Sequence, residues 1–348
     1  MSHPLPLRRS NAMRALLVGC GGISRTWLEA LRGIPEIELV GLVDLIEAQA
    51  RSRAAEFGLD LPLGTDLSEM LRRTAPDVVF DCTVPEAHYG VTLTALELGC
   101  HVLGEKPMSD SLAQAQAMVA AAQRTGKVYA VTQNRRFNRQ LRRLKAFLAT
   151  GQLGQVTAVN ADFFIGAHFG GFRERMKHVL LNDMAIHTFD AARFLTETDA
   201  QAVYCHEWNP AGSWYDHGAA AIATFEMTGG VVFNYRGSWV AEGLRTSWES
   251  EWRIVGERGS VSWDGAGKMV AEVVAETPGL LSTYRSPPIP PVNEEWPEGH
   301  AGVITDFVRA LQTGGIPETV CWDNIKSLAM VFGAIESAVA RRRVEIAL

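Results

Sequence analysis

Residues 16–24 read Leu-Leu-Val-Gly-Cys-Gly-Gly-Ile-Ser, an apolar run that breaks at glycines and passes at once into a helical pattern. Gly19 allows a tight turn after a strand. Gly21 has no side chain and lets the backbone approach a pyrophosphate at the N-terminus of the next helix. Ser24 stands where this fingerprint usually has a third glycine, and it is small enough for close packing of helix on strand. The stretch therefore predicts the strand, turn and helix that open a dinucleotide-binding Rossmann fold.

A second apolar run, residues 37–43, ends in Asp44, 25 residues after Gly19. A carboxylate at the end of the second Rossmann strand binds the adenine ribose hydroxyls and repels a 2′-phosphate. A glycine turn without a nucleotide is the alternative, and Asp44 makes it the weaker one. We predict NAD as the cofactor, with NADP as the alternative. In that case Arg51 or Arg53 would contact the extra phosphate.

The order of apolar runs predicts two domains. Short β-branched runs alternate with helical patterns between residues 13 and 134, which predicts an α/β domain with a doubly wound parallel sheet. Its strands are expected at 15–19, 37–43, 78–82, 101–104 and 128–132. Residues 135–348 predict a substrate and oligomerisation domain of α and β elements with a largely antiparallel, open sheet.

The strands of this second domain are expected at 155–165, 201–208, 219–227, 230–238, 250–255 and 259–263. Helices are expected at 138–149, 181–195, 300–313 and 323–342, the last one packing back on the first domain. Residues 1–12 predict a disordered tail, because they carry prolines and arginines and no apolar segment.

Charge and cysteine usage exclude several classes of protein. The net charge of −6 provides no basic field for nucleic acid. No apolar stretch reaches the roughly 20 residues that span a bilayer. The five cysteines are odd in number and lack CxxC spacing, which favours a reducing cytoplasm. We expect a cytoplasmic protein that binds neither nucleic acid nor membrane.

Two groups of side chains could carry chemistry. Lys106, in Glu105-Lys106-Pro107, follows a predicted strand at the edge where parallel sheets bind ligands. Asp183, His187 and Asp190 are spaced i, i+4 and i+7, so one helix face would present carboxylates beside an imidazole. The same face could ligate zinc, or Asp183 could simply cap the helix. Without an HExxH or CxxC pattern we predict no metal site.

These features together resemble the glucose-fructose oxidoreductase, inositol dehydrogenase and MocA family over essentially the whole chain from Met13. The resemblance rests on the glycine turn at 19–24, Thr-Val-Pro-Glu-Ala-His at 83–88, Glu-Lys-Pro at 105–107, Asn-Arg-Arg-Phe at 134–137 and Asp183-x-x-x-His187-x-x-Asp190. Ala185 and the residues at 180–182 depart from the family's usual glycines, which alters the wall around the acid and base groups.

The resemblance implies a Rossmann domain followed by an α/β domain whose open sheet mediates homodimer or homotetramer contacts, with the active site in the cleft between the domains. It implies Lys106, Asp183 and His187 as catalytic residues. The cofactor would be bound by Gly19, Gly21, Gly22, Ile23, Ser24, Asp44, Thr83, Pro85, His88, Glu105 and Asn134. Substrate contacts are expected from His168, Arg173 and Asn182, on the segment before the Asp/His helix.

We therefore predict an NAD-dependent oxidoreductase that interconverts a secondary hydroxyl and a ketone on a sugar, sugar acid or cyclitol. One alternative is an enzyme with retained NAD that uses an internal redox cycle for glycoside cleavage or aldose exchange. Another is a non-catalytic regulator that senses a dinucleotide or a sugar through the same fold.

Overall fold

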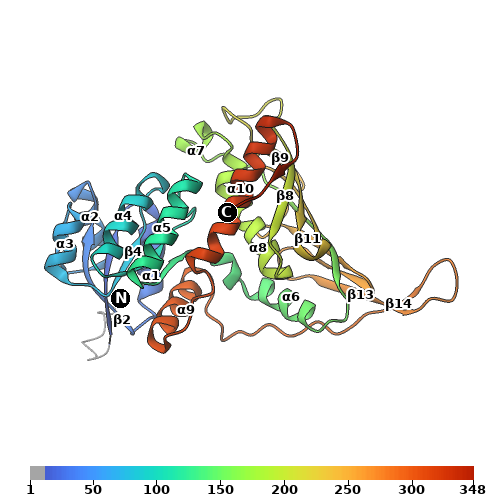
Figure 1. Cartoon of the computed structure of the whole chain (residues 1–348), viewed down its shortest axis with the longest axis horizontal. Coiled ribbons are helices and arrows are strands. Elements are labelled where there is room, and N and C mark those ends of the chain that lie inside the picture. Colours follow the sequence, from blue (N-terminus) through green and yellow to red (C-terminus); the bar gives the residue numbers. More distant parts are fainter. Residues whose placement is uncertain (1–11) are drawn as a thin grey trace. The chain divides into compact units, whose positions relative to one another are not determined.

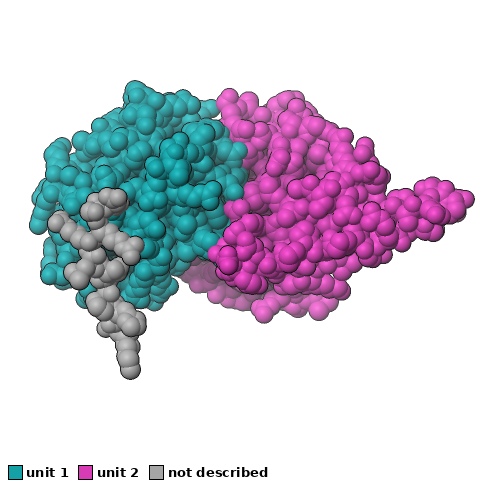
Figure 2. All heavy atoms as spheres, turned by 90° about the horizontal axis from the view of Figure 1, so that it is seen from below, with its two compact units in different colours: residues 1–137, 297–325 teal, residues 138–296, 326–348 magenta. Residues whose placement is uncertain are grey.

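The computed structural model describes residues 12–348, so all of the predicted tail except Ala12 lies outside the described residues. The chain forms two compact units, coloured separately in Figure 2. Unit 1 contains the chain up to Phe137 together with Pro297–Ile325, and unit 2 contains Asn138–Trp296 and Lys326–Leu348. Helix α10 (Cys321–Ala340) begins in unit 1 and continues in unit 2. Its expected packing on the first domain stays a prediction.

Unit 1 is built on a parallel sheet of six strands in the order β3-β2-β1-β4-β5-β6. This is the Rossmann order, so the predicted doubly wound sheet is confirmed. The five predicted strands lie within two residues of those observed, and β3 is additional. The strands are β1 (Met13–Val18), β2 (Ile37–Val43), β3 (Leu63–Gly64), β4 (Val78–Asp81), β5 (His101–Gly104) and β6 (Tyr129–Val131).

The helices of unit 1 surround this sheet (Figure 1). They are α1 (Gly22–Leu31), α2 (Glu47–Phe57), α3 (Leu67–Thr74), α4 (Pro85–Glu97), α5 (Leu112–Thr125), the 3₁₀ helix η1 (Asn134–Phe137) and α9 (Gly299–Thr313). Ordinary capping sets several ends. Asp66 and Ser111 accept backbone N–H groups at the starts of α3 and α5, and Gly58 and Gly126 end α2 and α5 in the left-handed conformation.

Helix α9 belongs to the core of unit 1 although it follows all of Asn138–Trp296 in the chain. Its apolar side chains Ile304 and Phe307 are fully buried and belong to one cluster with Trp27 of α1 and Phe80 of β4. Burial of large apolar side chains is the main stabilising term in such a core. The dinucleotide helix α1 is therefore supported by a segment that is distant in sequence.

Unit 2 contains a sheet of nine strands in the order β14-β13-β12-β11-β7-β10-β9-β8-β15. Its pairs are antiparallel except for β7 with β10, so the predicted largely antiparallel sheet is confirmed. The strands are β7 (Val156–Phe164), β8 (Ala200–Trp208), β9 (Ala220–Met227), β10 (Val232–Ser238), β11 (Glu251–Gly256), β12 (Gly259–Trp263), β13 (Met269–Glu276), β14 (Thr283–Arg285) and β15 (Val344–Glu345). Six match predicted strands within two residues, and β13 to β15 were not predicted.

The two faces of this sheet differ in polarity. On β7, Val159, Ala161 and Phe163 are buried, whereas Asn160 and Asp162 between them are partly exposed. The helices of unit 2 that accompany the sheet are α6 (Arg139–Ala149), α7 (Phe172–Arg175), the π-helix η2 (Leu180–Ala185) and α8 (Ile186–Thr196). The hairpin of β13 and β14 projects from the rest of unit 2 (Figure 1).

A search of residues 12–348 for a helix long and apolar enough to cross a membrane finds none.

Candidate active site

The glycine turn after β1 has the geometry that a dinucleotide site requires. Gly19 has φ +87°, and a Cβ there would lie 2.7 Å from the backbone carbonyl of Cys82. Both the backbone conformation and this close contact therefore exclude a side chain. A Cβ on Gly21 or Gly22 would meet nothing within 4 Å in the described part of the chain. The turn is therefore tight against β4 but open above the N-terminus of α1, where a pyrophosphate fits.

Hydrogen bonds to the carbonyl oxygen of Gly21 hold this turn in place. Ser24 is fully buried, and its hydroxyl donates to the carbonyl oxygen of Gly21 at 2.6 Å. Arg53 of α2 donates from Nη2 to the same oxygen at 2.8 Å and also pairs with Glu56. Ser24 is small, as the prediction requires, and its hydrogen bond to the turn is an addition that the sequence did not indicate. Ile23, in the first turn of α1, is exposed on its surface.

Asp44 lies directly after β2 and faces the glycine turn. Its Oδ2 accepts the N–H of Cys20 and its Oδ1 accepts the N–H of Ile46, both at 2.8 Å. Each carboxylate oxygen keeps capacity for a further hydrogen bond. The chain therefore has residues that fit NAD: the glycine turn would hold the pyrophosphate and Asp44 would bind the adenine ribose.

The loop after β4 carries three of the predicted cofactor residues. Thr83 donates from its backbone and its hydroxyl to Oδ1 of Asp81, and Pro85 is the first residue of α4. His88 is 1% exposed. Its Nδ1 lies 2.9 Å from the carbonyl oxygen of Pro107 and its Nε2 lies 3.1 Å from that of Thr83. The imidazole therefore joins the loop after β4 to the loop after β5.

The loop after β5 carries Glu105 and Lys106, and the Lys106–Pro107 bond is cis, as Pro107 allows. The Glu105 side chain is 9% exposed, and its Oε1 accepts Trp27 Nε1–H at 2.6 Å and His300 Nε2–H at 2.9 Å. Its Oε2 accepts the backbone N–H of Lys106 at 3.2 Å. Burial alone would raise the pKa of Glu105, but the hydrogen bonds from His300 and Trp27 and the nearby charges hold this pKa below its ordinary value.

These loops follow the carboxyl ends of β1, β2, β4 and β5, and Asn134 begins η1 just after β6. The carboxyl ends of parallel strands lie at one edge of a sheet. The structure therefore brings the predicted cofactor residues and Lys106 together at one edge of unit 1. The carboxylate of Glu105, which is predicted to line the cofactor, is bonded to Trp27, His300 and the Lys106 backbone.

Asp183 and His187 lie in unit 2 on one continuous helical segment. Asp183 belongs to the π-helix η2, and His187 follows in the first turn of α8 with 8% exposure. The sequence predicts a regular helix at 181–195, so the π turn is a difference. A π turn places residues differently around the axis than an α turn and often marks a functional site. Asn182 donates its side-chain amide to the carbonyl oxygen of Lys177.

The segment before η2 places one predicted substrate residue beside Asp183. Arg173 donates from Nε to Asp183 Oδ2 at 3.0 Å, and its guanidinium lies 5.1 Å from the ring centre of Phe169 and 5.0 Å from that of Phe172. His168 stacks on Trp214 with 3.7 Å between ring centres, and it bonds Glu242. Arg173 therefore restrains Asp183 directly, while His168 is held by the neighbouring loops.

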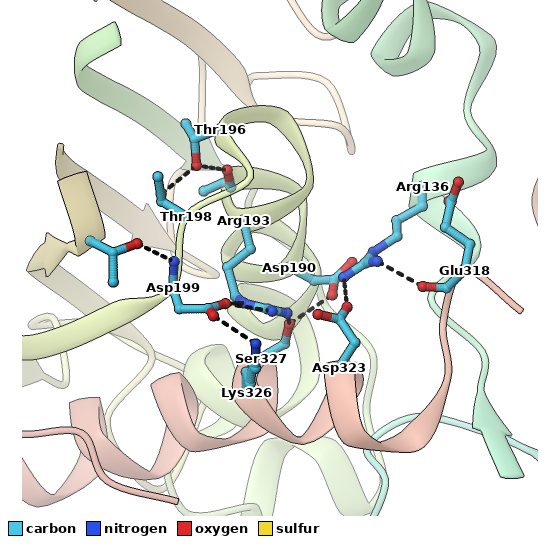
Figure 3. Close-up of polar contacts among 12 residues, drawn as sticks. Arg136, Asp190, Arg193, Thr196, Thr198, Asp199, Glu318, Asp323, Lys326 and Ser327 are labelled. Atoms are coloured by element: carbon cyan, nitrogen blue, oxygen red, sulfur yellow. Dashed lines mark hydrogen bonds and ion pairs between the residues drawn. The ribbon is translucent and has the colours of Figure 1, made fainter. Parts of the chain in front are cut away.

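Helix α8 is anchored by a partly buried polar network, drawn in Figure 3. Ser327 of α10 donates to Asp190 Oδ1 at 2.7 Å and accepts from Arg193 Nη1 at 2.9 Å. Arg193 also pairs with Asp199, which in turn binds Lys326. Asp190, predicted to share a face with Asp183 and His187, is thus bonded to α10.

The described residues contain no cluster with the ligands of a metal site. Across the 337 residues from Ala12 onward, no group of three or more His, Cys, Asp or Glu side chains is arranged to hold a metal ion. The five cysteines are all buried and free. Burial raises the pKa of Cys20 to about 12, with a further contribution from the charge of Asp44, which is the behaviour of a core thiol.

Sequence reasoning missed three side chains that hold the site in place. Trp27 and His300 bind Glu105, and Arg193 ties α8 to Asp199 and α10. No local pattern indicates them, because each is defined by a partner more than five residues away. The one usable signal was the presence of a histidine and a tryptophan among otherwise apolar helix positions.

Comparisons with known proteins agree with this geometry. The profile of an oxidoreductase family with an NAD-binding Rossmann fold matches residues 13–133. The profile of the GFO/IDH/MocA C-terminal domain matches residues 141–262. The D-apiose dehydrogenase of Paraburkholderia graminis is 28% identical over 346 residues, which cover 96% of this chain and 89% of the relative.

A second relative, the 1,5-anhydro-D-fructose reductase of Ensifer adhaerens, is 24% identical over 343 residues, covering 95% of this chain and 97% of the relative. The fold is similar to that of an oxidoreductase from Agrobacterium radiobacter, solved with NAD⁺, L-tartaric acid and magnesium. The TM-score is 0.84 at 20% identity, with 96% of this chain and 98% of that chain covered. The chain belongs to the GFO/IDH/MocA family and is an NAD-binding oxidoreductase of the sugar and cyclitol dehydrogenase type.

Proposed function

We propose that the protein oxidises a secondary hydroxyl of a sugar, sugar acid or cyclitol with NAD⁺, or reduces the matching ketone. The observation that carries this proposal is Lys106, which follows β5 at the same sheet edge as the glycine turn and Asp44. An ammonium group at that edge can act on a substrate beside the cofactor. Asp183 and His187 supply the acid and base groups of unit 2.

In the proposed mechanism each protein group has a separate task. NAD⁺ supplies the hydride acceptor when it is bound. His187 takes the proton of the substrate hydroxyl, because an imidazole exchanges protons near neutral pH. The Lys106 ammonium stabilises the developing alkoxide. Asp183, held by Arg173, orients the hydroxyl or the imidazole.

The substrate is a small, polar, polyhydroxylated molecule. His168, Arg173 and Asn182 are its proposed further contacts, because all three lie on the segment that leads into Asp183. Relatives are named for D-apiose, D-glucosides and 1,5-anhydro-D-fructose, which are chemically of this class.

A dehydrogenase screen tests this function. The protein is incubated with NAD⁺ and a panel of aldoses, sugar acids, glycosides and inositols, and in the reverse direction with NADH and 1,5-anhydro-D-fructose. We expect one chemical class to change the absorbance of NADH at a rate that depends on substrate concentration. A panel without any turnover, despite saturable NADH binding, contradicts the proposal and favours a sensor.

The internal redox cycle is distinguished by the state of the cofactor. An enzyme of that kind retains NAD through purification and converts substrate without net NADH formation. We expect instead that NAD⁺ exchanges freely and that NADH accumulates with product. The relatives named as dehydrogenases and reductases support this expectation.

We further propose that the protein forms a homodimer or homotetramer through the outer face of the nine-stranded sheet. A hydrogen-bonded row on that face runs across β9, β10 and β7 through Thr224, Asn234 and Asn160. A groove lined by Asn160, Arg236, Arg253 and Lys268 lies on the sheet, and Ile222 is exposed in the same region. The five buried, free cysteines support a cytoplasmic setting.

A further inference from the structure

Glu105 is the point at which three segments of unit 1 meet. Its Oε1 accepts hydrogen bonds from Trp27 of α1 and His300 of α9, and its Oε2 accepts the backbone N–H of Lys106. One carboxylate therefore connects the helix of the dinucleotide turn, the residue that carries the ammonium, and helix α9, which lies in the chain between the two segments of unit 2.

An ionised carboxylate in such a place is stable only while its hydrogen bonds persist. The Trp27 and Glu105 side chains are buried, and the His300 side chain is 13% exposed. His300 is thus the donor at the rim of this cluster. The backbone of α9 cannot move it easily, because Val303 and Ile304 in the next turn are part of the unit 1 core.

We propose that His300 is a positioning residue for Lys106 and acts through Glu105. Its Nε2–H holds the carboxylate in the orientation in which Oε2 receives the Lys106 backbone. Without this donor, Oε1 keeps only the Trp27 hydrogen bond. The carboxylate can then rotate, and the backbone of Lys106, which carries the ammonium, loses the hydrogen bond to Oε2 that restrains it. His300 itself does not touch the substrate. The inference rests on the proposed catalytic role of Lys106.

Three variants at position 300 and on α9 separate positioning from general damage. His300→Ala removes the donor, and His300→Gln places an amide N–H near the position of Nε2. Val308→Ala is the matched control, because it removes packing from the same helix two turns away without touching Glu105. Turnover is measured with the polyol or sugar that gives the fastest NADH formation in the screen described above, and NADH binding by fluorescence titration.

We expect His300→Ala to lower kcat about tenfold with the NADH Kd within twofold of wild type. His300→Gln should recover kcat to within threefold, and Val308→Ala should lower the melting temperature while kcat stays near wild type. In the Lys106→Ala background, His300→Ala should change kcat less than twofold, because the group that it positions is already absent.

Full activity of His300→Ala overturns the inference. An equal loss of kcat on His300→Ala in the wild-type and Lys106→Ala backgrounds also overturns it, since His300 would then act independently of Lys106. Failure of His300→Gln to recover activity overturns it as well. If Lys106→Ala itself keeps normal turnover, the proposed function of Lys106 fails and the inference fails with it. An equal loss of kcat in both backgrounds is a different result, because it rules out the role of His300 and leaves the proposed role of Lys106 intact.

Discussion

Asp44 is held by two backbone amides, so its carboxylate keeps one orientation beside the glycine turn. Arg53, the cation in reach of this turn, already donates to the Gly21 carbonyl and pairs with Glu56. Arg51 pairs with Glu47 on the surface. A 2′-phosphate would therefore meet a fixed negative charge, and both nearby arginines already have partners.

We predict that NADH binds at least tenfold more tightly than NADPH, a difference of about 1.4 kcal/mol. Asp44→Asn should reduce this ratio because it removes the repulsive charge. Asp60→Asn, an exposed site, removes the same charge elsewhere and should leave the ratio unchanged. Fluorescence titration with both cofactors measures it, and tighter NADPH binding by the wild type contradicts the role of Asp44.

A second prediction at this scale concerns metals. Asp183 is bound by Arg173, and the proposed chemistry uses proton transfer from the substrate hydroxyl to His187 without a Lewis acid. We predict that dialysis against a chelator leaves turnover unchanged. Loss of turnover that zinc restores, and fresh buffer does not, would make His187 a metal ligand.

At the scale of elements, α8 owes its position to contacts with α10 and with the turn before β8. Arg193 and Lys326 both bind Asp199, which is half-exposed. Burial alone would raise the pKa of Asp199, but the hydrogen bonds from Lys326 and Arg193 hold it below its ordinary value. A carboxylate with a lowered pKa stabilises the fold while it is ionised.

This predicts how stability depends on pH. The contribution of Asp199 is present in full above the ordinary Asp pKa of about 3.9, and it is lost as the pH falls through the lower folded value. Asp199→Asn should therefore unfold at a lower temperature than wild type at pH 6, with the gap narrowing toward pH 3. Thermal scans across this range measure the gap. A gap that does not change with pH means that the charge of Asp199 contributes nothing.

Most long elements could be predicted from the sequence, because their apolar periodicity is local. The strands β3, β14 and β15 have only two or three residues and are formed by pairing with other strands. No local sequence pattern therefore predicts them. The π turn at η2 could not be predicted, because an α turn would contain the same apolar residues. Asp44 and Lys106 could be placed at the sheet edge because each lies within two residues of the end of a strand. The contacts of Glu105 with Trp27 and His300 could not be predicted, since the partners lie 78 and 195 positions away in the chain.

At the scale of the whole molecule, the outer face of the nine-stranded sheet bears on assembly. We predict that Ile222→Arg, in the exposed region of β9, converts the wild-type oligomer to a monomer by burying an unpaired charge in the interface. Ile316→Arg, at a more exposed position in unit 1, should leave the mass unchanged. Light scattering after size exclusion measures both. A monomeric wild type, or an unaffected Ile222→Arg oligomer, contradicts the proposed interface.

The central claim is that Lys106, Asp183 and His187 act together on one substrate hydroxyl. Its most direct test is the kcat of Lys106→Ala and of His187→Ala, measured beside the NADH Kd of each variant. We predict that each substitution lowers kcat by about 10² or more while the Kd changes less than threefold, since neither side chain is needed to hold the cofactor. Near-normal turnover of His187→Ala with none in Lys106→Ala would make Lys106 the base, and near-normal turnover of both variants would contradict the account.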